Sequence, residues 1–222
     1  MKNSKDPKII ILIGPPGSGK GTQAKLLAEK FGLEYIGSGD VLRARQKVGD
    51  FTGKKLKKVM NKGELAPSFI VSKVLGDKLE KLKRNSKIKG LVLDGWTRII
   101  IEAILTDEAL NWYEWDKNVE VFLINISAKE SFNRLTKRRQ CKKCGNLIPR
   151  VGDFRKLTKC NKCGGKLITR IDDTIQSIEK RLEEYKKETT KAINYYKKHG
   201  RLIKINGEQS IEDVFKDILK TL

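Results

Sequence analysis

The sequence predicts an α/β fold in which a parallel β-sheet is wrapped by helices. Residues 9–13 are five consecutive aliphatics, the pattern of a strand buried on both faces, and a glycine-rich loop and a helix follow directly. Short apolar stretches then alternate with longer amphipathic segments along the 222 residues, the order of elements that builds parallel sheets. The length suits one sizeable core with one or two small inserted modules.

The loop after this first strand has the composition of a phosphate-binding loop. Residues 14–22 read G-P-P-G-S-G-K-G-T. The glycines let the backbone turn sharply and present its N–H groups inward, and Lys20 supplies a point charge for β- and γ-phosphates. A helix that starts near Gly21 adds its positive N-terminal end. The common pattern has Ser or Thr directly after the lysine, whereas here Gly21 precedes Thr22. The sequence therefore predicts binding of a nucleoside triphosphate.

The remaining elements follow from hydrophobic periodicity and from turn residues. We expect helices over residues 21–31, 51–60, 68–82, 129–140, 172–198 and 211–222, and strands over residues 33–36, 90–93, 119–126 and 202–205. Gly32 fits the stop of the first helix, and Gly63 and Pro67 separate the second helix from the third. The chain has no internal repeat and no low-complexity linker.

All four cysteines lie in one short segment. They form two C-x-x-C pairs separated by 15 residues: Cys141, Cys144, Cys160 and Cys163. Two such pairs at this spacing can close a tetrahedral thiolate cage around Zn²⁺. Two disulfides or a redox pair are the alternatives, and a zinc knuckle also occurs in proteins that bind nucleic acid.

The chain is strongly basic, with 48 Lys plus Arg against 27 Asp plus Glu and a formal net charge of +21. The lysines are spread along the whole chain, which favours a solvated basic surface around an anionic active site over a nucleic-acid partner. No segment approaches the roughly 20 apolar residues of a membrane span. Residues 1–8 are polar and lack the apolar core of a signal peptide, so we expect a cytoplasmic protein.

Several arginines stand at the predicted edges of elements. They are Arg43, Arg98, Arg134, Arg138, Arg170 and Arg181. A hydrolase needs one or two positive groups around a single triphosphate. Two nucleotides that meet phosphate to phosphate bring far more negative charge, which planar guanidinium groups can hold with two hydrogen bonds each. The arginines therefore favour phosphoryl transfer between nucleotides over hydrolysis.

With these motifs in place, the chain resembles the nucleoside monophosphate kinases, and most closely the adenylate kinases of the long-lid, zinc-containing type. Residues 14–22 resemble the family's G-x-P-G-x-G-K-G-T, residues 37–43 its S-T-G-D-x-L-R, residues 94–98 its D-G-F-P-R and residues 138–145 its R-R-x-C-x-x-C-G. The second cysteine pair, the R-I-D-D run of residues 170–173, the Arg-Leu pair at 181–182 and residues 205–209 follow in the expected order. The resemblance covers nearly the whole chain.

The resemblance implies three domains and one reaction. A P-loop kinase core would comprise residues 1–36, 67–136 and 174–222, with a helical monophosphate-binding segment at 37–66 and a zinc-stapled lid at 137–173. The reaction would be reversible phosphoryl transfer from MgATP to AMP, giving two ADP. The enzyme would catalyse this reaction by aligning the two nucleotides, neutralising the charge of their phosphates and closing its lid. The resemblance also implies Mg²⁺ with ATP, a structural Zn²⁺, nucleotides as the partners and a monomer, without an obligatory nucleic acid or membrane.

Carried over motif by motif, the resemblance also implies the site residues. Those expected to bind ATP are Gly17, Ser18, Gly19, Lys20, Gly21, Thr22, Arg138, Leu147, Ile148 and Gln209. Those expected to bind AMP are Ser38, Arg43, Glu64, Leu65, Ala66, Gly95, Trp96, Thr97, Arg98, Glu102, Arg170 and Arg181. The expected catalytic residues are Lys20, Arg98, Arg134, Arg138, Arg170 and Arg181, and Asp40 and Asp94 would hold Mg²⁺ through water. The zinc ligands would be the four cysteines.

This chain departs from the family pattern at several site positions. Glu102 stands where the family reads the adenine of AMP with glutamine. An ionised carboxylate only accepts hydrogen bonds, which would suit the N1–H and N2–H₂ donors of guanine. Thr97 replaces a proline, Ile148 an aromatic residue and Ile175 an acidic one. We expect AMP as the acceptor. GMP, CMP or UMP as acceptor, a nucleic-acid-associated zinc ATPase and a catalytically weak homologue are the alternatives.

Overall fold

The computed structural model of the chain describes residues 6–84, 88–149, 151–170 and 172–222. The predicted core includes residues 1–5 and 85–87, and the predicted lid includes residues 150 and 171; these positions lie outside the described residues. Eight strands are described: β1 (Lys8–Ile13), β2 (Glu34–Gly37), β3 (Gly90–Asp94), β4 (Val119–Asn125), β5 (Arg139–Cys141), β6 (Leu147–Ile148), β7 (Leu167–Ile168) and β8 (Leu202–Asn206).

The helical elements lie between these strands and after the last of them. In the described part of the chain they are α1 (Lys20–Phe31), α2 (Ser38–Gln46), α3 (Phe51–Asn61), α4 (Ser68–Lys83), α5 (Ile100–Trp112), α6 (Ala128–Lys137), the 3₁₀ turn η1 (Gly152–Lys156), α7 (Ile175–Glu184), the π turn η2 (Tyr185–Thr189), α8 (Thr190–Lys198) and α9 (Ile211–Leu219). None of the helices in the described ranges combines the length and the apolar character needed to cross a membrane.

The main sheet has five strands in the order β2-β3-β1-β4-β8, and every neighbouring pair is parallel. This confirms the predicted α/β class with a parallel sheet wrapped by helices. Because β1 lies between β3 and β4, the loop that follows β1 leaves the sheet beside the end of β3, where Asp94 pairs with Leu12. Ligands of open parallel sheets bind at this kind of edge, outside the carboxyl ends of the strands.

Alternation along β1 divides the apolar side chains between two cores. Ile9, Ile11 and Ile13 lie in one core with residues of α4, α5 and α8, whereas Ile10 and Leu12 lie in the other with residues of α1 and α9. Full burial of an aliphatic side chain stabilises a fold by roughly 1.5–3 kcal/mol. A central strand buried on both faces therefore holds the phosphate loop on a rigid support.

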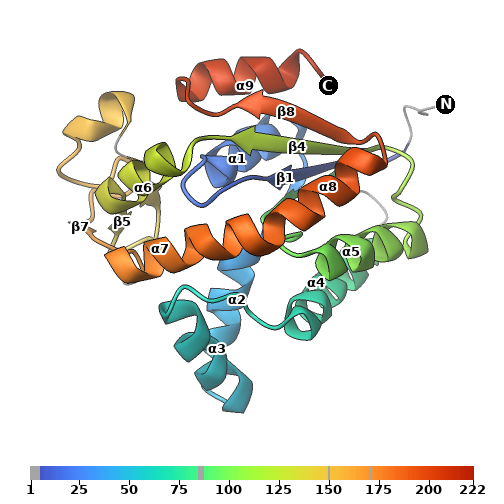
Figure 1. Cartoon of the computed structure of the whole chain (residues 1–222), viewed down its shortest axis with the longest axis horizontal. Helices are drawn as coiled ribbons and strands as arrows, with labels where there is room; N and C mark the ends of the chain where they lie inside the picture. Colours follow the sequence, from blue (N-terminus) through green and yellow to red (C-terminus); the bar gives the residue numbers. More distant parts are fainter. Residues whose placement is uncertain (1–5, 85–87, 150, 171) are drawn as a thin grey trace.

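Two smaller parts extend from this core (Figure 1). Helices α2 and α3 project at the bottom of the view, and the cysteine-rich segment lies at the left beyond α6. In that segment β5 pairs antiparallel with both β6 and β7. The long helix α7–α8 crosses in front of the sheet, with the π turn η2 between its two halves.

Among the differences from the sequence prediction are two helix boundaries and one unpredicted helix, and each has a local cause. The long helix begins at Ile175 rather than at residue 172, because the Thr174 side chain accepts a hydrogen bond from the Ser177 N–H and caps it. Helix α6 ends at Lys137, since β5 begins two residues later. Helix α5 was not predicted: its apolar residues surround the axis, so the segment lacks a polar stripe to mark the period.

Candidate functional site

A cleft of about 670 Å³ opens at the carboxyl ends of the sheet strands. The loop after β1, helix α2, residues 63–66, the end of β3, the cysteine-rich segment, α7 and the loop after β8 all contribute to its walls. Most of the site residues expected from the sequence line it. From the expected ATP set these are Gly17, Ser18, Gly19, Lys20, Gly21, Thr22, Arg138, Leu147 and Gln209. From the remaining sets they are Ser38, Asp40, Arg43, Glu64, Leu65, Ala66, Asp94, Gly95, Thr97, Arg98, Arg134, Arg170 and Arg181.

The phosphate loop has the geometry that its glycines predict. Gly17 and Gly19 have φ angles of 79° and 96°, in the region that residues with a Cβ rarely adopt. Gly19 is the N-cap of α1, so the first turn of that helix presents its N–H groups beside the loop. The loop and the helix N-terminus together form an anion-binding surface.

The side chain of Lys20 folds back over this loop. Its Nζ donates to the carbonyl oxygens of Gly14 and Pro15 at 2.8 and 2.9 Å. Burial lowers the pKa of Lys20 to about 8, with the charges of Arg98 and Arg138 acting in the same direction and that of Asp94 opposing them. A phosphate group beside Lys20 would supply the negative charge that this buried ammonium lacks.

Two arginines enter the cleft from the side of α2 and β3. Arg98 donates through Nε to the Gly95 carbonyl at 3.1 Å and through Nη2 to the Ser38 hydroxyl at 3.3 Å. Arg43 pairs with Asp40 at 2.6 Å across one turn of α2. Burial lowers the pKa of Arg98, while the nearby carboxylates, first among them that of Glu102, oppose the shift.

The other arginines approach from the cysteine-rich segment, α6 and α7. Asp173, whose side chain is 0% exposed, accepts from Arg138 at 2.8 and 2.7 Å and from Arg181 at 2.6 Å. Arg170 pairs with Asp172. Burial alone would raise the pKa of Asp173, but the hydrogen bonds and charges of Arg138 and Arg181 outweigh it and hold the pKa below its usual value.

Arg134 lines the cleft from α6. Its Nε donates to Glu130 at 2.6 Å and its Nη2 to the carbonyl of Gly207 at 2.9 Å. Protein carboxylates and carbonyls thus engage the arginines around the cleft in this state. Phosphate oxygens could accept from the same guanidinium groups.

Two carboxylates that line the cleft, Asp40 and Asp94, suit a hydrated divalent cation. The Tyr35 hydroxyl lies 3.2 Å from Asp40 Oδ2 and 3.3 Å from Asp94 Oδ2, and so joins the two side chains. Burial raises the pKa of Asp94, while the charges of Lys20 and Arg98 counteract this effect. Carboxylate oxygens that leave room for water are the ligand set that Mg²⁺ prefers. Tyr35 carries no motif signal in the sequence, and only the fold reveals this contact.

The four cysteine sulfurs form one cluster in which all Sγ atoms lie within 4.8 Å of one another. Cys141 and Cys163 are 3.5 Å apart and Cys144 and Cys160 are 3.7 Å apart, and all four are free thiols. A tetrahedron with Zn–S bonds of about 2.3 Å has edges of roughly 3.8 Å, so these distances fit zinc. The backbone N–H groups of Cys144 and Lys162 point at Cys141 and Cys160 sulfurs, at 3.5 and 3.4 Å. Such contacts are typical of thiolate ligands.

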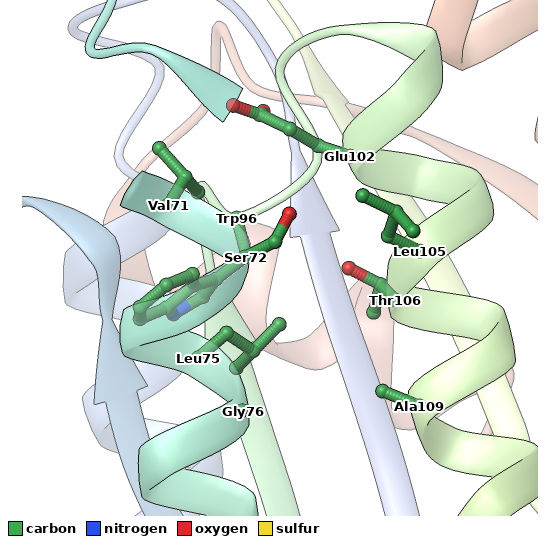
Figure 2. A pocket seen from close by; sticks show the side chains of 9 residues that line it. All are labelled: Val71, Ser72, Leu75, Gly76, Trp96, Glu102, Leu105, Thr106 and Ala109. Carbon is green, nitrogen blue, oxygen red and sulfur yellow. The ribbon is translucent and has the colours of Figure 1, made fainter. Parts of the chain in front are cut away.

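Three of the described residues that we expected to bind nucleotides do not line the cleft. Trp96 is 0% exposed, and its indole N–H donates to the Ile36 carbonyl at 2.7 Å. Ile148 is buried because alternate side chains of β6 point to opposite faces, and Leu147 takes the cleft side. Glu102 lies in the first turn of α5 and borders a separate cavity of about 20 Å³ (Figure 2). Direct contact of these three residues with a nucleotide stays a prediction.

The cleft is also lined by residues that the sequence did not predict. Gln140, Asn146, Pro149 and Phe154 of the cysteine-rich segment line it, as does Tyr185 of the π turn. Phe154 is the one signal that could have been used, since an aromatic residue in a short polar module suggests a contact surface. The other residues carry no sequence signal for a site, and only the folded chain brings them to the cleft.

Comparisons with known proteins agree with this geometry. The family model described as "Adenylate kinase" matches residues 12–201. The adenylate kinase of Thermodesulfovibrio yellowstonii is 40% identical over 215 residues, which cover 96% of this chain and 98% of the relative. The adenylate kinase of Archaeoglobus fulgidus is 38% identical, covering 94% and 95%. That of Methanothrix thermoacetophila is 40% identical, covering 96% and 97%.

Proposed function

The chain belongs to the adenylate kinase family, and from this premise we propose that it transfers a phosphoryl group reversibly from MgATP to AMP, giving two ADP. The observation that carries the proposal is the convergence of Lys20 and six arginines on one cleft beside a single phosphate loop. Two nucleotides that meet through their phosphates need this much positive charge, whereas hydrolysis of one triphosphate does not.

On the donor side, we propose that the phosphate loop and Lys20 hold the β- and γ-phosphates of ATP. The N–H groups of the loop and of the first turn of α1 would bind the phosphate oxygens. Leu147 and Gln209 would border the donor nucleoside, because both lie in the cleft. Ile148 would support Leu147 from the buried side of β6.

On the acceptor side, Arg43 and Arg98 would grip the phosphate of AMP, with Ser38 and Gly95 beside them. Residues 64–66 would border the acceptor base, since they line the same cleft. Trp96 would act indirectly, by fixing the end of β3 against β2 through its hydrogen bond to Ile36. Thr97 would line the path between the base and Arg98.

The transfer itself would need no strong general base, because the attacking oxygen already belongs to a phosphate. Lys20, Arg98, Arg134, Arg138, Arg170 and Arg181 would align the two phosphates and neutralise the charge that spreads over the transferring group. Asp172 and Asp173 would hold Arg138, Arg170 and Arg181 in place before the nucleotides arrive.

We further propose the three-domain arrangement of core, monophosphate-binding segment (37–66) and lid (137–173). The α2–α3 segment and the cysteine-rich segment both extend beyond the core (Figure 1) and both line the cleft. Closure of the lid would exclude water from the reacting phosphates and so prevent hydrolysis.

Two metals fit the side chains of this chain. Asp40 and Asp94 would hold Mg²⁺ through water, and the ion would neutralise charge on the phosphates of ATP. Cys141, Cys144, Cys160 and Cys163 would hold one structural Zn²⁺, whose closed thiolate shell leaves no position for chemistry. The free thiols suit a reducing, cytoplasmic location. One chain supplies every residue of the proposed site, which fits a monomer that needs no nucleic acid.

The proposal is tested by an acceptor panel. The purified protein is incubated with MgATP and with AMP, GMP, CMP or UMP, and the nucleoside diphosphates are quantified. We expect AMP to be the best acceptor. ATP consumption that requires RNA and produces no second diphosphate would instead support a nucleic-acid-associated ATPase.

A further inference from the structure

Glu102 is a carboxylate that the protein buries beside its acceptor-side arginine. The residue is 4% exposed, and burial raises the pKa of its carboxyl group, while the N–H and the charge of Arg98 oppose that shift. Figure 2 shows its side chain reaching from the first turn of α5 toward α4, across one end of the small cavity that Trp96 and Leu105 also border. A buried acid of this kind needs hydrogen-bond partners.

Those partners are backbone groups of the loop that carries Arg98. Glu102 Oε2 accepts from the N–H of Arg98 at 2.8 Å and from the N–H of Ile99 at 3.3 Å. Ile99 is the N-cap of α5 and has no polar side chain of its own. Glu102 therefore satisfies N–H groups that the start of the helix leaves without an intrahelical partner.

The same loop is anchored at its other end through the Arg98 side chain. Arg98 Nε donates to the Gly95 carbonyl, and Nη2 donates to Ser38. Gly95 has a φ of 68°, so the turn after β3 is sharp. Thr97, directly before Arg98, lacks the fixed φ of the proline that the family pattern has there. The hydrogen bonds of the Arg98 backbone and side chain therefore restrain this turn.

We propose that Glu102 is a positioning residue: its carboxylate fixes the backbone of Arg98, and through it the guanidinium that binds the acceptor phosphate, and it does not read the acceptor base. The inference deepens the proposed phosphotransferase function and rests on it. It predicts that base preference is independent of the charge of residue 102, while acceptor affinity depends on a hydrogen-bond acceptor at that position.

Two variants separate positioning from base reading. Glu102→Gln keeps a carbonyl oxygen that can accept from both N–H groups, so the ratio of kcat/KM for AMP and GMP stays as in the parent. Glu102→Ala removes the acceptor. We expect KM for AMP and for GMP to rise by the same factor, roughly 2- to 10-fold for the lost hydrogen bonds, with KM for ATP unchanged.

Ser210→Ala is the matched control. Ser210 Oγ accepts from the Asp213 N–H at 3.0 Å and caps α9, so this variant also loses a helix cap but leaves Arg98 untouched. Amide hydrogen exchange provides a readout without nucleotides. Exchange at Arg98 and Ile99 should accelerate in Glu102→Ala and stay at the parent rate in Glu102→Gln and Ser210→Ala.

The outcomes test the positioning role of Glu102 separately from the proposed phosphotransferase function. A changed AMP-to-GMP ratio in Glu102→Gln would show that the carboxylate reads the base and would overturn the inference. Unchanged exchange at Arg98 together with unchanged acceptor KM in Glu102→Ala would overturn it as well. If Glu102→Ala does not fold, the ratio in Glu102→Gln still decides. Absence of phosphoryl transfer in the parent protein would refute the proposed function, whereas the exchange rates would still report on the contact between Glu102 and Arg98.

Discussion

The hydroxyl group of Tyr35 occupies the space that a side chain on residue 37 would need. Gly37 has a φ of −94°, which any residue adopts. A Cβ at that position would lie 2.9 Å from Tyr35 Cζ and closer still to the hydroxyl oxygen. The same hydroxyl joins Asp40 and Asp94, which line the cleft. The backbone conformation at position 37 therefore does not call for glycine, and a side chain there would have to displace the tyrosine hydroxyl.

Gly37→Ser, which restores the residue of the family motif, should displace the Tyr35 ring and destabilise the fold. Overpacking of this kind costs roughly 1–3 kcal/mol, to be measured by denaturant unfolding. In a Tyr35→Ala background the same substitution should cost much less, because the added side chain then has room. Additive effects of the two substitutions would show that the residues do not compete for space.

Lys20→Ala should lower turnover with MgATP and AMP by orders of magnitude, because it removes charge stabilisation at the transferring phosphate. Initial rates under saturating nucleotide measure the effect. Lys73→Ala is the matched control, since Lys73 is 68% exposed and pairs only across one turn of α4 with Asp77. Rates close to those of the parent in Lys20→Ala would contradict the proposed role of the phosphate loop.

Asp173 should make the protein sensitive to acid. Its folded pKa lies below the unfolded value of about 3.9. The stability it contributes is therefore present above that unfolded value and is lost as the pH falls toward the folded pKa. Asp173→Asn should cost roughly 3 kcal/mol at neutral pH, because it leaves Arg138 and Arg181 without their shared carboxylate.

The free energy of unfolding, measured by urea between about pH 3 and pH 7, tests this expectation. The variant should show a shallower loss of stability toward acid than the parent. Asp77→Asn is the control: Asp77 is 66% exposed, and such a pair contributes roughly 0–1 kcal/mol. Parallel pH profiles for the parent and Asp173→Asn would contradict the assigned role of the Asp173 carboxylate.

The cysteine cluster should carry about one Zn²⁺ per chain. Elemental analysis of freshly purified, reduced protein measures the metal, and a chelator should lower the Tm. Cys160→Ser should lose zinc and stability while the phosphate loop remains able to bind ATP, since the cluster lies in a different segment. Protein that contains no zinc and is indifferent to the chelator would refute the site.

The sequence determined the elements whose signals are local. The apolar run of β1, the glycines and lysine of the loop after it, and the spacing of the cysteine pairs each carry their physical reason within a few residues. The strand–helix alternation fixed the class of fold for the same reason. Helix α5 was not predicted because its apolar residues leave no polar stripe. The burial of Ile148 could not be predicted either, because the face of a short strand depends on what covers it.

Only the tertiary structure decided which of these residues meet. Asp173 joins Arg138 and Arg181 from separate elements, and Tyr35 reaches Asp94 across 59 positions of the chain. Glu102 accepts hydrogen bonds from the N–H groups of Arg98 and Ile99, because a carboxylate buried at the start of α5 needs such partners. Such contacts arise when packing brings distant segments together, and no local pattern of residue types encodes which atom will be nearest.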